Sequence, residues 1–339
     1  MKILGIETSC DETAASVVEN GRKILSNIVA SSWEMHAKTG GVIPETAARA
    51  QVLSIIPTIS EALNEAELDL TKIDALAITV GPGLIGSLLV GVETAKTLAL
   101  LYKKPIIPVN HLVAHIYANW LTDMPEPDFP ALALVVSGGH TDLVLLKAHG
   151  STSWIGGTRD DAAGEAFDKT ARLLGLPYPG GPAISNESAK YLNGGVKTLN
   201  FFPRPLAHQK NFEWSFSGLK TAVSRTVGEN SSGFDVPRLA AEIQEAIVEV
   251  LVEKTLRAVG KFKPKSLLLA GGVAANLRLR EKLEFELSKS TFKTDFRVPP
   301  PRLCTDNAAY IAACAFYNPA RLPWQKIESR PELTIVGLP

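Results

Sequence analysis

Short apolar runs separated by polar turns fill the beginning of the chain. Residues 3–8, 14–18 and 22–30 are rich in Val, Ile, Leu and Ala. This pattern predicts three strands, the first two joined by a tight polar turn. Residues 45–65 space their apolar positions as a helix does, and we expect this helix to kink at Pro57. The apolar positions expected on one face of the helix are Val52, Ile55, Ile56, Ile59 and Leu63.

A second kind of unit follows, in which a buried strand passes through a glycine-rich turn into a helix. Residues 74–80 predict the strand, the sequence GPGLIGS at 81–87 the turn, and the apolar stretch that ends at Tyr102 the helix. Residues 105–109 predict a further strand, which ends directly before Asn110. The first third of the chain therefore has the alternating order of an α/β protein.

The same patterns begin again after the Pro-rich segment at residues 124–130. Residues 131–136 and 143–147 predict two strands joined by the turn SGGHTD, and residues 153–157 predict a third. A helix is expected near residues 163–174. The restart indicates a second folding unit.

The last part of the chain returns to long periodic segments after an irregular stretch. Residues 175–235 are rich in Gly, Pro and Asn, which predicts an insertion made of loops. Residues 237–260 predict a strongly amphipathic helix, and 266–270 a buried strand followed by a glycine turn and another helix. A last helix is expected at 307–317, and an irregular tail from Asn318.

The order of elements repeats between the two halves, although their sequences differ. Strand, polar turn and strand occur at 3–18 and 131–147, while strand, glycine turn and helix occur at 76–100 and 266–288. Two such halves predict two α/β lobes around a cleft, because ligands bind at the carboxyl ends of strands. The parts expected are a first lobe at 1–125, a second lobe at 126–300 with its insertion at 175–235, a C-terminal helix in 301–325 that packs back on the first lobe, and an irregular tail at 326–339.

Composition restricts the classes of protein that fit. The 339 residues are 45% hydrophobic and 21% charged, which excludes disorder over the whole chain and suits two domains. The 35 basic and 35 acidic residues cancel, so a nucleic-acid partner needs a local patch or the help of another subunit. The basic clusters at 261–265 and 278–282 are expected to be mostly solvated rather than bound to RNA.

The cysteines and the N-terminus indicate a cytoplasmic protein. Cys10, Cys304 and Cys314 form no CxxC pair, which excludes a zinc ribbon or a thioredoxin-type motif. A sparse, odd number of cysteines fits a reducing compartment. The first residues lack the pattern of a signal peptide, and no apolar run approaches the roughly 20 residues of a membrane span, so no membrane partner is expected.

The segment HLVAH at 111–115 has the most specific chemical pattern in the sequence. His111 and His115 are spaced to lie on one face of a helix, where both imidazoles can bind one divalent ion. A zinc peptidase would also need Glu directly after the first His, but that position is Leu112, so the peptidase lacks its base. Asp306 is a candidate third ligand and is equally suited to be the N-cap of the last helix.

The polar turns are candidates for nucleotide contact. Ser137 and the two glycines after it leave backbone N–H groups open to a phosphate, although a plain hairpin has the same composition. A matching polar turn at residues 8–12 in the first half favours the ligand role. The turn at 81–87 is at least as well explained by tight packing, whereas Asn276 lies at a helix start that suits an anion or a ribose, or else is held by local backbone.

Charged residues near these turns have two interpretations each. In the run DDAAGEAFDK, Asp161 is a candidate helix cap, while Glu165 and Asp168 share a face and suit ribose, a metal or an amine. A solvated helix face is the alternative for all of them. His140 is expected to contact or orient substrate, or to be an ordinary surface histidine.

Taken in order, these motifs resemble one family over residues 3–320. The chain is similar to the TsaD family, the universal tRNA threonylcarbamoyladenosine transferases, and its details resemble the bacterial branch. The segments that match the family are GIETSCDETA at 5–14, NHLVAH at 110–115, VSGGHT at 136–141, DDAAGEAFDK at 160–169, YPGGP at 178–182, WSFSGLKTA at 214–222, LAGGVAAN at 269–276 and CTDNAAYIA at 304–312.

The resemblance implies a fold and an activity. The fold is α/β, with two actin-like (ASKHA, ribonuclease H-like) lobes and a central cleft. The activity is transfer of a threonylcarbamoyl group from threonylcarbamoyl-AMP to N6 of the adenosine just 3′ of the anticodon, in tRNAs that read codons starting with A. An actin-like nucleotide-binding scaffold and a small-molecule kinase of the same fold are the alternatives.

The resemblance also assigns roles to residues of this chain. It implies a metal held by His111, His115 and Asp306, which favours the ligand role of Asp306. Asp11, Glu12 and His140 are candidates for catalysis or for positioning groups in the cleft. The implied substrate contacts are Val135, Val136, Ser137, Gly138, Gly139, Asp168, Gly181 and Asn276, with Ser185 at a position where some members have Asp.

Cofactors and partners follow from the same resemblance. One divalent metal ion per chain is expected, with Fe2+ favoured and Zn2+ as the alternative, together with an adenine nucleotide or threonylcarbamoyl-AMP in the cleft. The expected partners are tRNA, a smaller paralogue of the same fold (TsaB-type) and a small P-loop ATPase (TsaE-type). The helices near 46–64 and 85–102 are the expected docking surface.

Overall fold

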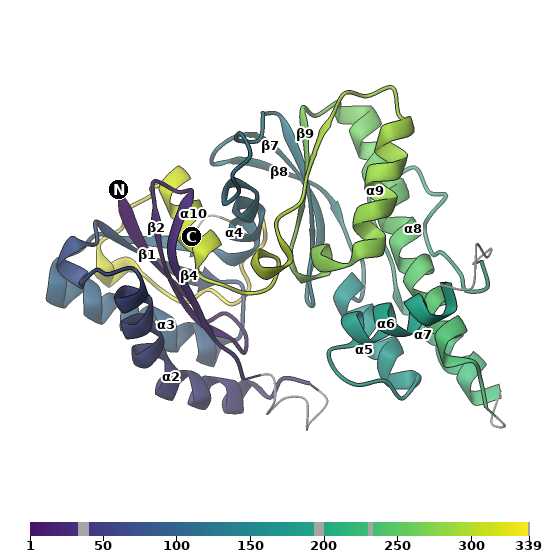
Figure 1. Ribbon diagram of the computed structural model, residues 1–339, viewed down its shortest axis with the longest axis horizontal. Helices are drawn as coiled ribbons and strands as arrows, with labels where there is room; N and C mark the ends of the chain where they lie inside the picture. The colour runs from purple at the N-terminus through teal and green to yellow at the C-terminus, as the bar shows by residue number, and fades with distance from the viewer. Residues whose placement is uncertain (33–40, 193–199, 230–232, 338–339) are drawn as a thin grey trace. The chain divides into compact units, whose positions relative to one another are not determined.

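The computed structural model describes residues 1–32, 41–192, 200–229 and 233–337, and its elements are drawn in Figure 1. The chain forms two compact units, each built on its own five-stranded sheet. Unit 1 consists of Met1–Pro127, Lys147–Thr152 and Pro299–Pro339, and unit 2 consists of Asp128–Leu146 and Ser153–Val298.

The sheet of unit 1 has the order β3-β2-β1-β4-β5. Strand β1 pairs antiparallel with β2 and parallel with β4, so the carboxyl ends of β1, β4 and β5 lie at one edge of the sheet. The five strands predicted for this part of the chain are confirmed. Their bounds are Lys2–Glu7 (β1), Thr13–Glu19 (β2), Lys23–Ala30 (β3), Ala75–Gly81 (β4) and Ile106–Asn110 (β5).

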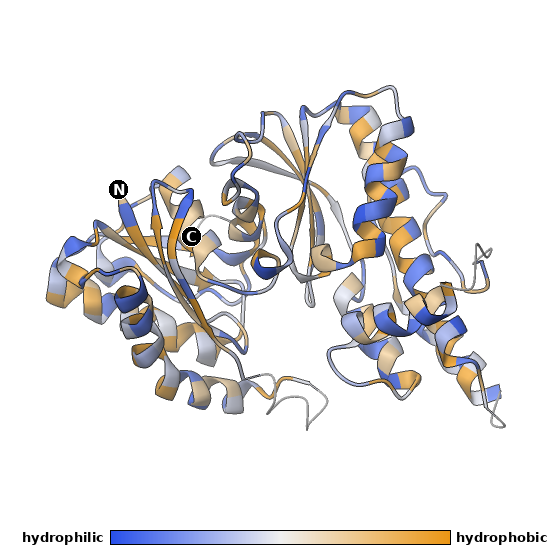
Figure 2. Ribbon diagram, viewed as in Figure 1, coloured by the Kyte–Doolittle hydropathy of each residue, from blue (hydrophilic) through white to orange (hydrophobic). Residues whose placement is uncertain are grey.

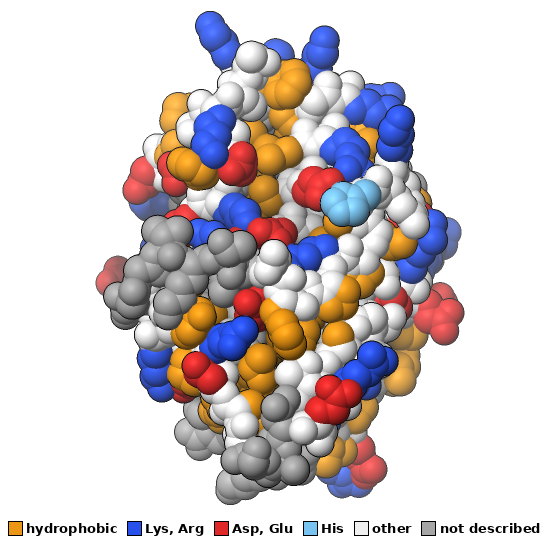
Figure 3. All heavy atoms as spheres, turned by 90° about the vertical axis from the view of Figure 1, so that its right-hand side faces the viewer, with side chains coloured by type: hydrophobic (Ala, Val, Ile, Leu, Met, Phe, Trp, Pro, Cys, Tyr) orange, Lys and Arg blue, Asp and Glu red, His pale blue; other side chains and the backbone are white. Residues whose placement is uncertain are grey.

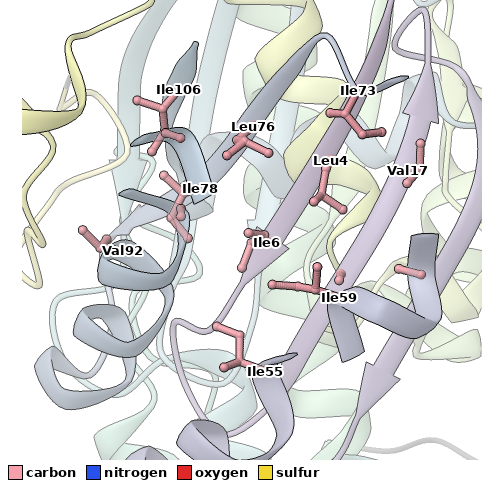
Figure 4. Close-up of a cluster of buried hydrophobic side chains, with 14 of the residues drawn as sticks. Leu4, Ile6, Val17, Ile55, Ile59, Ile73, Leu76, Ile78, Val92 and Ile106 are labelled. Atoms are coloured by element: carbon pink, nitrogen blue, oxygen red, sulfur yellow. The ribbon is translucent and has the colours of Figure 1, made fainter. Parts of the chain in front are cut away.

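In the described residues of unit 1, four α-helices pack on the sheet or on one another. Helices α2 and α3 pack together and against the sheet, and α10 packs on β1 and α4. Figure 4 shows Leu4, Ile6 and other aliphatic side chains of β1, β2, β4 and β5 meeting those of α2 and α3, and Figure 2 colours these strands largely hydrophobic. The bounds are Pro44–Glu65 (α2), Ile85–Tyr102 (α3), His111–Tyr117 (α4) and Ala309–Tyr317 (α10).

The apolar side chains that helix α2 turns toward the core differ in part from those predicted. It continues through Pro57 as one helix, with Pro57 on its exposed side. Ile55 and Ile59 are buried as expected, but Val52 and Ile56 are 60% and 55% exposed. The prediction was wrong for these two because α2 turns a narrower face, one residue in three or four, to the sheet.

Helix α3 is apolar on both its buried and its exposed sides. It is the one helix among the described residues that is long and apolar enough to cross a membrane by length and composition. The expectation that no apolar run approaches this length was therefore wrong. A core helix of a globular protein has the same composition, and α3 packs against β4 and α2. Its remaining apolar side chains form an exposed surface.

The sheet of unit 2 has the order β10-β9-β6-β7-β8. Strand β6 pairs antiparallel with β7 and parallel with β9, so the first strand pair of unit 1 has its counterpart here. The predicted strands at 131–136, 143–147, 153–157 and 266–270 are confirmed. Their bounds, with the short edge strand, are Ala131–Val136 (β6), Thr141–Ala148 (β7), Ser151–Gly157 (β8), Ser266–Ala270 (β9) and Asp295–Arg297 (β10).

The described part of unit 2 contains five α-helices, and two of them lie where loops were expected. In residues 175–235 the described part contains α6 and α7. Helix α6 buries Gly180, Ile184 and Ser188, and α7 buries only Leu219 and Val223, so each apolar stripe is too sparse to register as a helix in the sequence. The bounds are Ala163–Leu173 (α5), Gly180–Leu192 (α6), Ser217–Glu229 (α7), Val236–Phe262 (α8) and Leu277–Lys289 (α9).

The C-terminal tail, which contains the short 3-10 helix Trp324–Lys326, is fastened to the sheet of unit 1. The backbone N–H of Arg330 donates to the carbonyl of Val80 at 2.6 Å, and Asn110 Nδ2 donates to the carbonyl of Thr334 at 2.9 Å. At Gly81, whose φ is 156°, an added Cβ would lie 1.8 Å from the carbonyl oxygen of Arg330. The glycine turn at 81–87 therefore allows close packing, which is the first of the two roles considered for this sequence.

Candidate functional site

The two histidines of HLVAH lie at the start of α4, directly after β5. The Asn110 carboxamide oxygen accepts from the backbone N–H of Leu112 at 3.0 Å and thereby caps the helix. His111 and His115 consequently occupy one helix face, one turn apart, and both are buried. Their Nε2 atoms face each other at 3.1 Å.

Asp306 joins the two histidines from the segment before α10. Its Oδ1 lies 3.4 Å from His115 Nε2 and 3.7 Å from His111 Nε2. The alternative role as helix cap is wrong, because α10 begins at Ala309 and Asn307 Oδ1 accepts from the Ala309 N–H at 3.0 Å. The Asp306 carboxylate is therefore free to face the histidines.

Small residues bring α10 close enough to β1 for this meeting. At Gly5 an added Cβ would lie 2.4 Å from the carbonyl oxygen of Ala308 and 3.1 Å from the Ala312 side chain. Since the segment 304–308 leads directly into α10, the approach of α10 to β1 also sets the position of Asp306.

The charges of the cluster are strongly coupled. Burial of His111 opposes its protonation, but the Glu7 and Asp306 carboxylates outweigh it and raise the pKa of His111 from 6.5 to about 9. Burial and the neighbouring His111 lower the pKa of His115. Burial favours neutral Asp306, yet the charge of His111 and the hydrogen bond with His115 hold the pKa of Asp306 well below its usual value.

These three side chains fit a metal ion. In the described part of the chain, their ligand atoms all lie within 4.8 Å of one another. Ligands about 2.0–2.1 Å from a tetrahedral metal lie about 3.3 Å apart, and the separations here are 3.1, 3.4 and 3.7 Å. Two imidazoles and a carboxylate suit Fe2+ or Zn2+, and three protein ligands leave coordination positions for substrate.

Two acidic residues of the β1–β2 turn lie in the same unit. Glu12 is half-buried, and burial together with the charges of Asp11 and Asp306 raises its pKa from 4.5 to about 7, against the opposing hydrogen bond from Ser31. Glu12 Oε1 accepts from the Ser31 hydroxyl at 2.7 Å, whereas its buried Oε2 has no hydrogen-bond partner among the described residues. The Asp11 backbone carbonyl accepts from the Ser32 hydroxyl at 2.6 Å.

In unit 2, hydrogen bonds within the turn between β6 and β7 hold its shape, and its two glycines border open space. The Ser137 N–H donates to the carbonyl of His140 at 2.8 Å, and the His140 N–H donates to Ser137 Oγ at 3.2 Å. At Gly138 and Gly139 an added Cβ would meet nothing within 4 Å. Space therefore borders the backbone of this turn, while Val135 and Val136 before it are fully buried.

The other predicted substrate residues of unit 2 fall into two connected groups. Asp168 Oδ1 accepts from the Gly180 N–H at 2.7 Å, beside Gly181, and burial raises the pKa of Asp168. Asn276 Nδ2 donates to Ser185 Oγ at 3.0 Å, and Asn276 Oδ1 caps α9 by accepting from the Leu279 N–H. Local backbone thus holds only one end of the Asn276 amide.

Sequence reasoning missed Gln244, which connects the second group. Gln244 Oε1 accepts from Ser185 Oγ at 2.8 Å and from Asn276 Nδ2 at 3.0 Å, and Gln244 Nε2 donates to Ser188 Oγ at 2.9 Å. Gln244 is 5% exposed within the core face of α8, and only its polarity at a buried helical position signalled a special role.

The remaining carboxylates of the run DDAAGEAFDK have structural roles. The prediction that Asp161 caps α5 was wrong. Ala162 precedes the helix without a side-chain cap, and Asp161 pairs with Lys169 at 2.7 Å. Lys169 also pairs with Glu165 at 2.8 Å. Asp160 instead accepts hydrogen bonds from the start of α7, among them from the Phe216 N–H at 2.7 Å.

The basic cluster on α9 is neutralised by its neighbours. Arg278 pairs with Glu245 at 2.8 Å, and Lys282 pairs with Glu249 at 3.0 Å. On the face of the molecule seen in Figure 3, basic and acidic side chains are interspersed. These residues therefore form ion pairs of α8 and α9 rather than an unpaired basic patch.

Solved structures with a similar fold define the class of protein. The (R)-2-hydroxyglutaryl-CoA dehydratase component A of Acidaminococcus fermentans matches with a TM-score of 0.55 and 15% identity, over 94% of this chain and 98% of that chain. Full-length HypF in its phosphate- and nucleotide-bound form matches with a TM-score of 0.58 and 13% identity, over 94% of this chain and 46% of its own. The chain therefore has an α/β fold of the actin-like ASKHA type.

Sequence comparison identifies the family within that class. The TsaD family model, described as tRNA N6-adenosine threonylcarbamoyltransferase, matches residues 23–313, and the chain belongs to this family. Proteins of that name are 53% identical in Dehalococcoides mccartyi, over 94% of both chains, and 50% identical in Thermomicrobium roseum, over 94% of this chain and 92% of the relative. The relative in Geobacillus kaustophilus is 47% identical, over 98% and 97%.

Proposed function

We propose that this chain performs the transfer for which its family is named. The N6 amine of the adenosine just 3′ of the anticodon attacks the carbamoyl carbon of threonylcarbamoyl-AMP. A C–N bond forms, the bond from that carbon to the AMP phosphate oxygen breaks, and the amine loses a proton. The meeting of His111, His115 and Asp306 in a chain of this family carries the proposal.

The metal ligands in this proposal are His111, His115 and Asp306. A bound Fe2+ or Zn2+ supplies Lewis-acid polarisation of a substrate oxygen, and family resemblance favours Fe2+. Leu112 stands where a zinc peptidase has its glutamate base, so the same two histidines do not suit peptide hydrolysis.

The adenylate is assigned to unit 2. Backbone N–H groups of Ser137 to Gly139 would offset charge on the departing phosphate, since the open side of this turn has room for it. Asn276 and Ser185, held by Gln244, would bind ribose hydroxyls, with Asp168 and Gly181 contacting the remainder of the substrate. In this chain the Ser185 hydroxyl takes the place of a carboxylate found in some members.

Glu12 is the best supported of the candidate bases Asp11, Glu12 and His140. Its pKa of about 7 suits a group that takes a proton at neutral pH, and its Oε2 has no partner among the described residues. His140 is bound through its backbone N–H to Ser137, which suits an orienting role at the turn. Adenine N6 is a weak nucleophile, so positioning supplies most of the rate in this scheme.

The exposed apolar side chains of α2 and α3 are proposed as the docking surface for the smaller paralogue. We call this set the helical apolar surface. Large exposed apolar patches mark interaction sites on globular proteins, and these two helices pack side by side. Its members are Val52, Leu53 and Ile56 of α2 and Ile85, Leu89, Leu100 and Leu101 of α3.

A reconstituted reaction tests the function. Unmodified tRNA and threonylcarbamoyl-AMP are incubated with the metal-loaded chain, alone and with the paralogue and the P-loop ATPase, and threonylcarbamoyl-adenosine is measured by mass spectrometry of nucleosides. We expect product in at least the complete mixture. Its absence from every mixture contradicts the proposal, and ATP-dependent phosphorylation of an acid or sugar without tRNA would favour the kinase.

A further inference from the structure

A buried carboxylate lies beside the candidate metal ligands without being one of them. Glu7 is the last residue of β1 and is 1% exposed. Its Oε1 accepts from the backbone N–H of Ser9 at 2.5 Å, and its Oε2 accepts from the Thr79 hydroxyl at 2.7 Å and faces His111 Nδ1 at 2.9 Å. A buried charge is costly unless hydrogen bonds satisfy it, and both oxygens are satisfied here.

We propose that Glu7 is a positioning residue, which accepts the Nδ1–H of His111 and so leaves Nε2, on the side of His115 and Asp306, as the ring nitrogen that can bind a metal. The inference rests on the proposed metal site and adds a residue that orients one of its ligands. A neutral imidazole carries one N–H, and the hydrogen bond at one ring nitrogen decides which nitrogen is free to bind a metal. In the opposite tautomer an N–H would occupy the ligand position.

The other hydrogen bonds of Glu7 make this arrangement specific to a carboxylate. The Ser9 N–H needs an acceptor at one end of the side chain, and His111 Nδ1–H needs an acceptor at the other. An amide has an acceptor at one end only, so in Glu7→Gln an NH2 group faces either the Ser9 N–H or His111. The Gln side chain has nearly the same size as Glu, so Glu7→Gln removes the hydrogen-bond acceptor and retains the packing.

The outer ring nitrogens of the two histidines have different partners, so Glu7 orients only one of the two rings. His115 Nδ1 is buried without a hydrogen-bond partner among the described residues, whereas His111 Nδ1 has Glu7 and, at 3.2 Å, Ser9 Oγ. Glu7 therefore acts on His111 alone. A carboxylate bound to the outer nitrogen of a ligand histidine typically accounts for about 10- to 100-fold in metal affinity.

Zinc binding to the full-length chain tests the proposal. Zn2+ affinity is measured by chelator competition for the wild type, Glu7→Gln and Thr79→Val, the last of which removes another hydrogen bond to the same carboxylate oxygen and leaves the contact with His111. We expect Glu7→Gln to bind Zn2+ about 10- to 100-fold more weakly, and Thr79→Val to stay within a few-fold of the wild type. Equal losses in both variants would indicate a merely structural role and overturn the proposal.

Nitrogen-15 NMR of the histidine rings in the Zn2+-loaded wild type gives a reading that needs no variant. The proposal expects His111 to carry its proton on Nδ1 and its metal on Nε2, with the Nδ1–H protected from exchange. Metal on Nδ1, or an unprotected Nδ1–H, contradicts it even if Glu7→Gln fails to fold. Failure of the wild type to bind Zn2+ or Fe2+ would instead contradict the metal site itself.

Discussion

At the scale of single residues, acidic groups in unit 1 are held in different protonation states. The hydrogen bonds and histidines around Asp306 keep it ionised, whereas burial and neighbouring negative charges keep Glu12 near its midpoint at neutral pH. Groups whose pKa values are pushed apart in this way suit different roles, a metal ligand and a base. The roles follow from the surroundings, because both side chains are carboxylates.

The first prediction concerns the pH dependence of transfer. Glu12 accepts a proton only when ionised, so the rate should rise with pH up to about 7 and then level off. Glu12→Gln should lower the rate by about 10²- to 10⁴-fold and abolish this rise. Single-turnover rates between pH 5 and 9, on the metal-loaded chain with its partners, provide the measurement.

Two variants shift this profile in opposite directions. The hydrogen bond from Ser31 lowers the pKa of Glu12, so Ser31→Ala should move the rise to higher pH. The charge of Asp11 raises that pKa, so Asp11→Asn should move it to lower pH. If Asp11→Asn instead abolishes transfer while Glu12→Gln retains the profile, Asp11 is the base.

At the scale of elements, the site depends on how closely helices approach strands. Helix α10 contacts β1 through Gly5, Ala308 and Ala312, and the segment before α10 carries Asp306. In unit 2, Asp160 joins α7 to the segment before α5 through hydrogen bonds with Ser215, Phe216 and Ser217. These contacts therefore help to place the starts of both helices.

Enlarging Gly5 should separate α10 from β1. In Gly5→Val the new side chain overlaps the Ala308 carbonyl, and overpacking of this kind costs about 1–3 kcal/mol. Asp306 moves with α10, so metal affinity should fall as well. Urea unfolding and zinc titration measure the two effects, with Gly181→Ala, where an added Cβ meets nothing within 4 Å, as the control for stability.

Removing the charge of Asp160 should loosen α7 in a pH-dependent manner. Partial burial favours the neutral acid, but hydrogen bonds from Ser215, Phe216 and Ser217 lower the pKa of Asp160 below 3.8. The stabilisation is therefore present above that value and lost as the pH falls through the lower pKa of the folded state. Asp160→Asn replaces the oxygen that accepts from the Ser215 and Ser217 hydroxyls, so it should cost about 1 kcal/mol at pH 7 and progressively less in acid, measured by urea unfolding. A difference in the free energy of unfolding between wild type and Asp160→Asn that does not depend on pH would speak against this role. An equal loss of stability in the exposed variant Asp123→Asn would do the same.

The sequence predicted most elements of both units because their burial is periodic. Strands such as β4 and β9 are buried along their whole length, which a short apolar run signals directly. Helices α6 and α7 were missed because so few of their residues are buried. The metal pair was predictable from its spacing, but Glu7 and Gln244 were not, since their partners lie 72 to 104 and 32 to 59 residues away in the chain.

At the scale of the whole molecule, neutral overall charge and an uncovered apolar surface point to function within an assembly. The 35 basic and 35 acidic residues leave no net attraction for tRNA, and charged α9 residues are already paired. The seven side chains of the helical apolar surface meanwhile face solvent in the single chain. Partner subunits are expected to cover this surface and to contribute to tRNA binding.

A charge on the helical apolar surface should prevent association without unfolding the chain. Leu53 is 79% exposed, so Leu53→Glu is expected to leave the free energy of unfolding within about 0.5 kcal/mol. Binding of the smaller paralogue, followed by analytical ultracentrifugation, should weaken by at least tenfold. Leu277→Glu on α9, at a side chain that is 66% exposed, is the matched control and should bind normally. Equal binding by both variants would exclude α2 from the interface.

The most direct measurement of the central claim combines metal content with transfer in one pair of proteins. Wild type and the double variant His111→Ala, His115→Ala are purified, their iron and zinc are quantified, and threonylcarbamoyl-adenosine is measured after a single turnover on unmodified tRNA with threonylcarbamoyl-AMP and the partner proteins. We predict one metal ion per wild-type chain together with product, and loss of both in the double variant. Full metal content and undiminished transfer in the variant would contradict the assignment of this site.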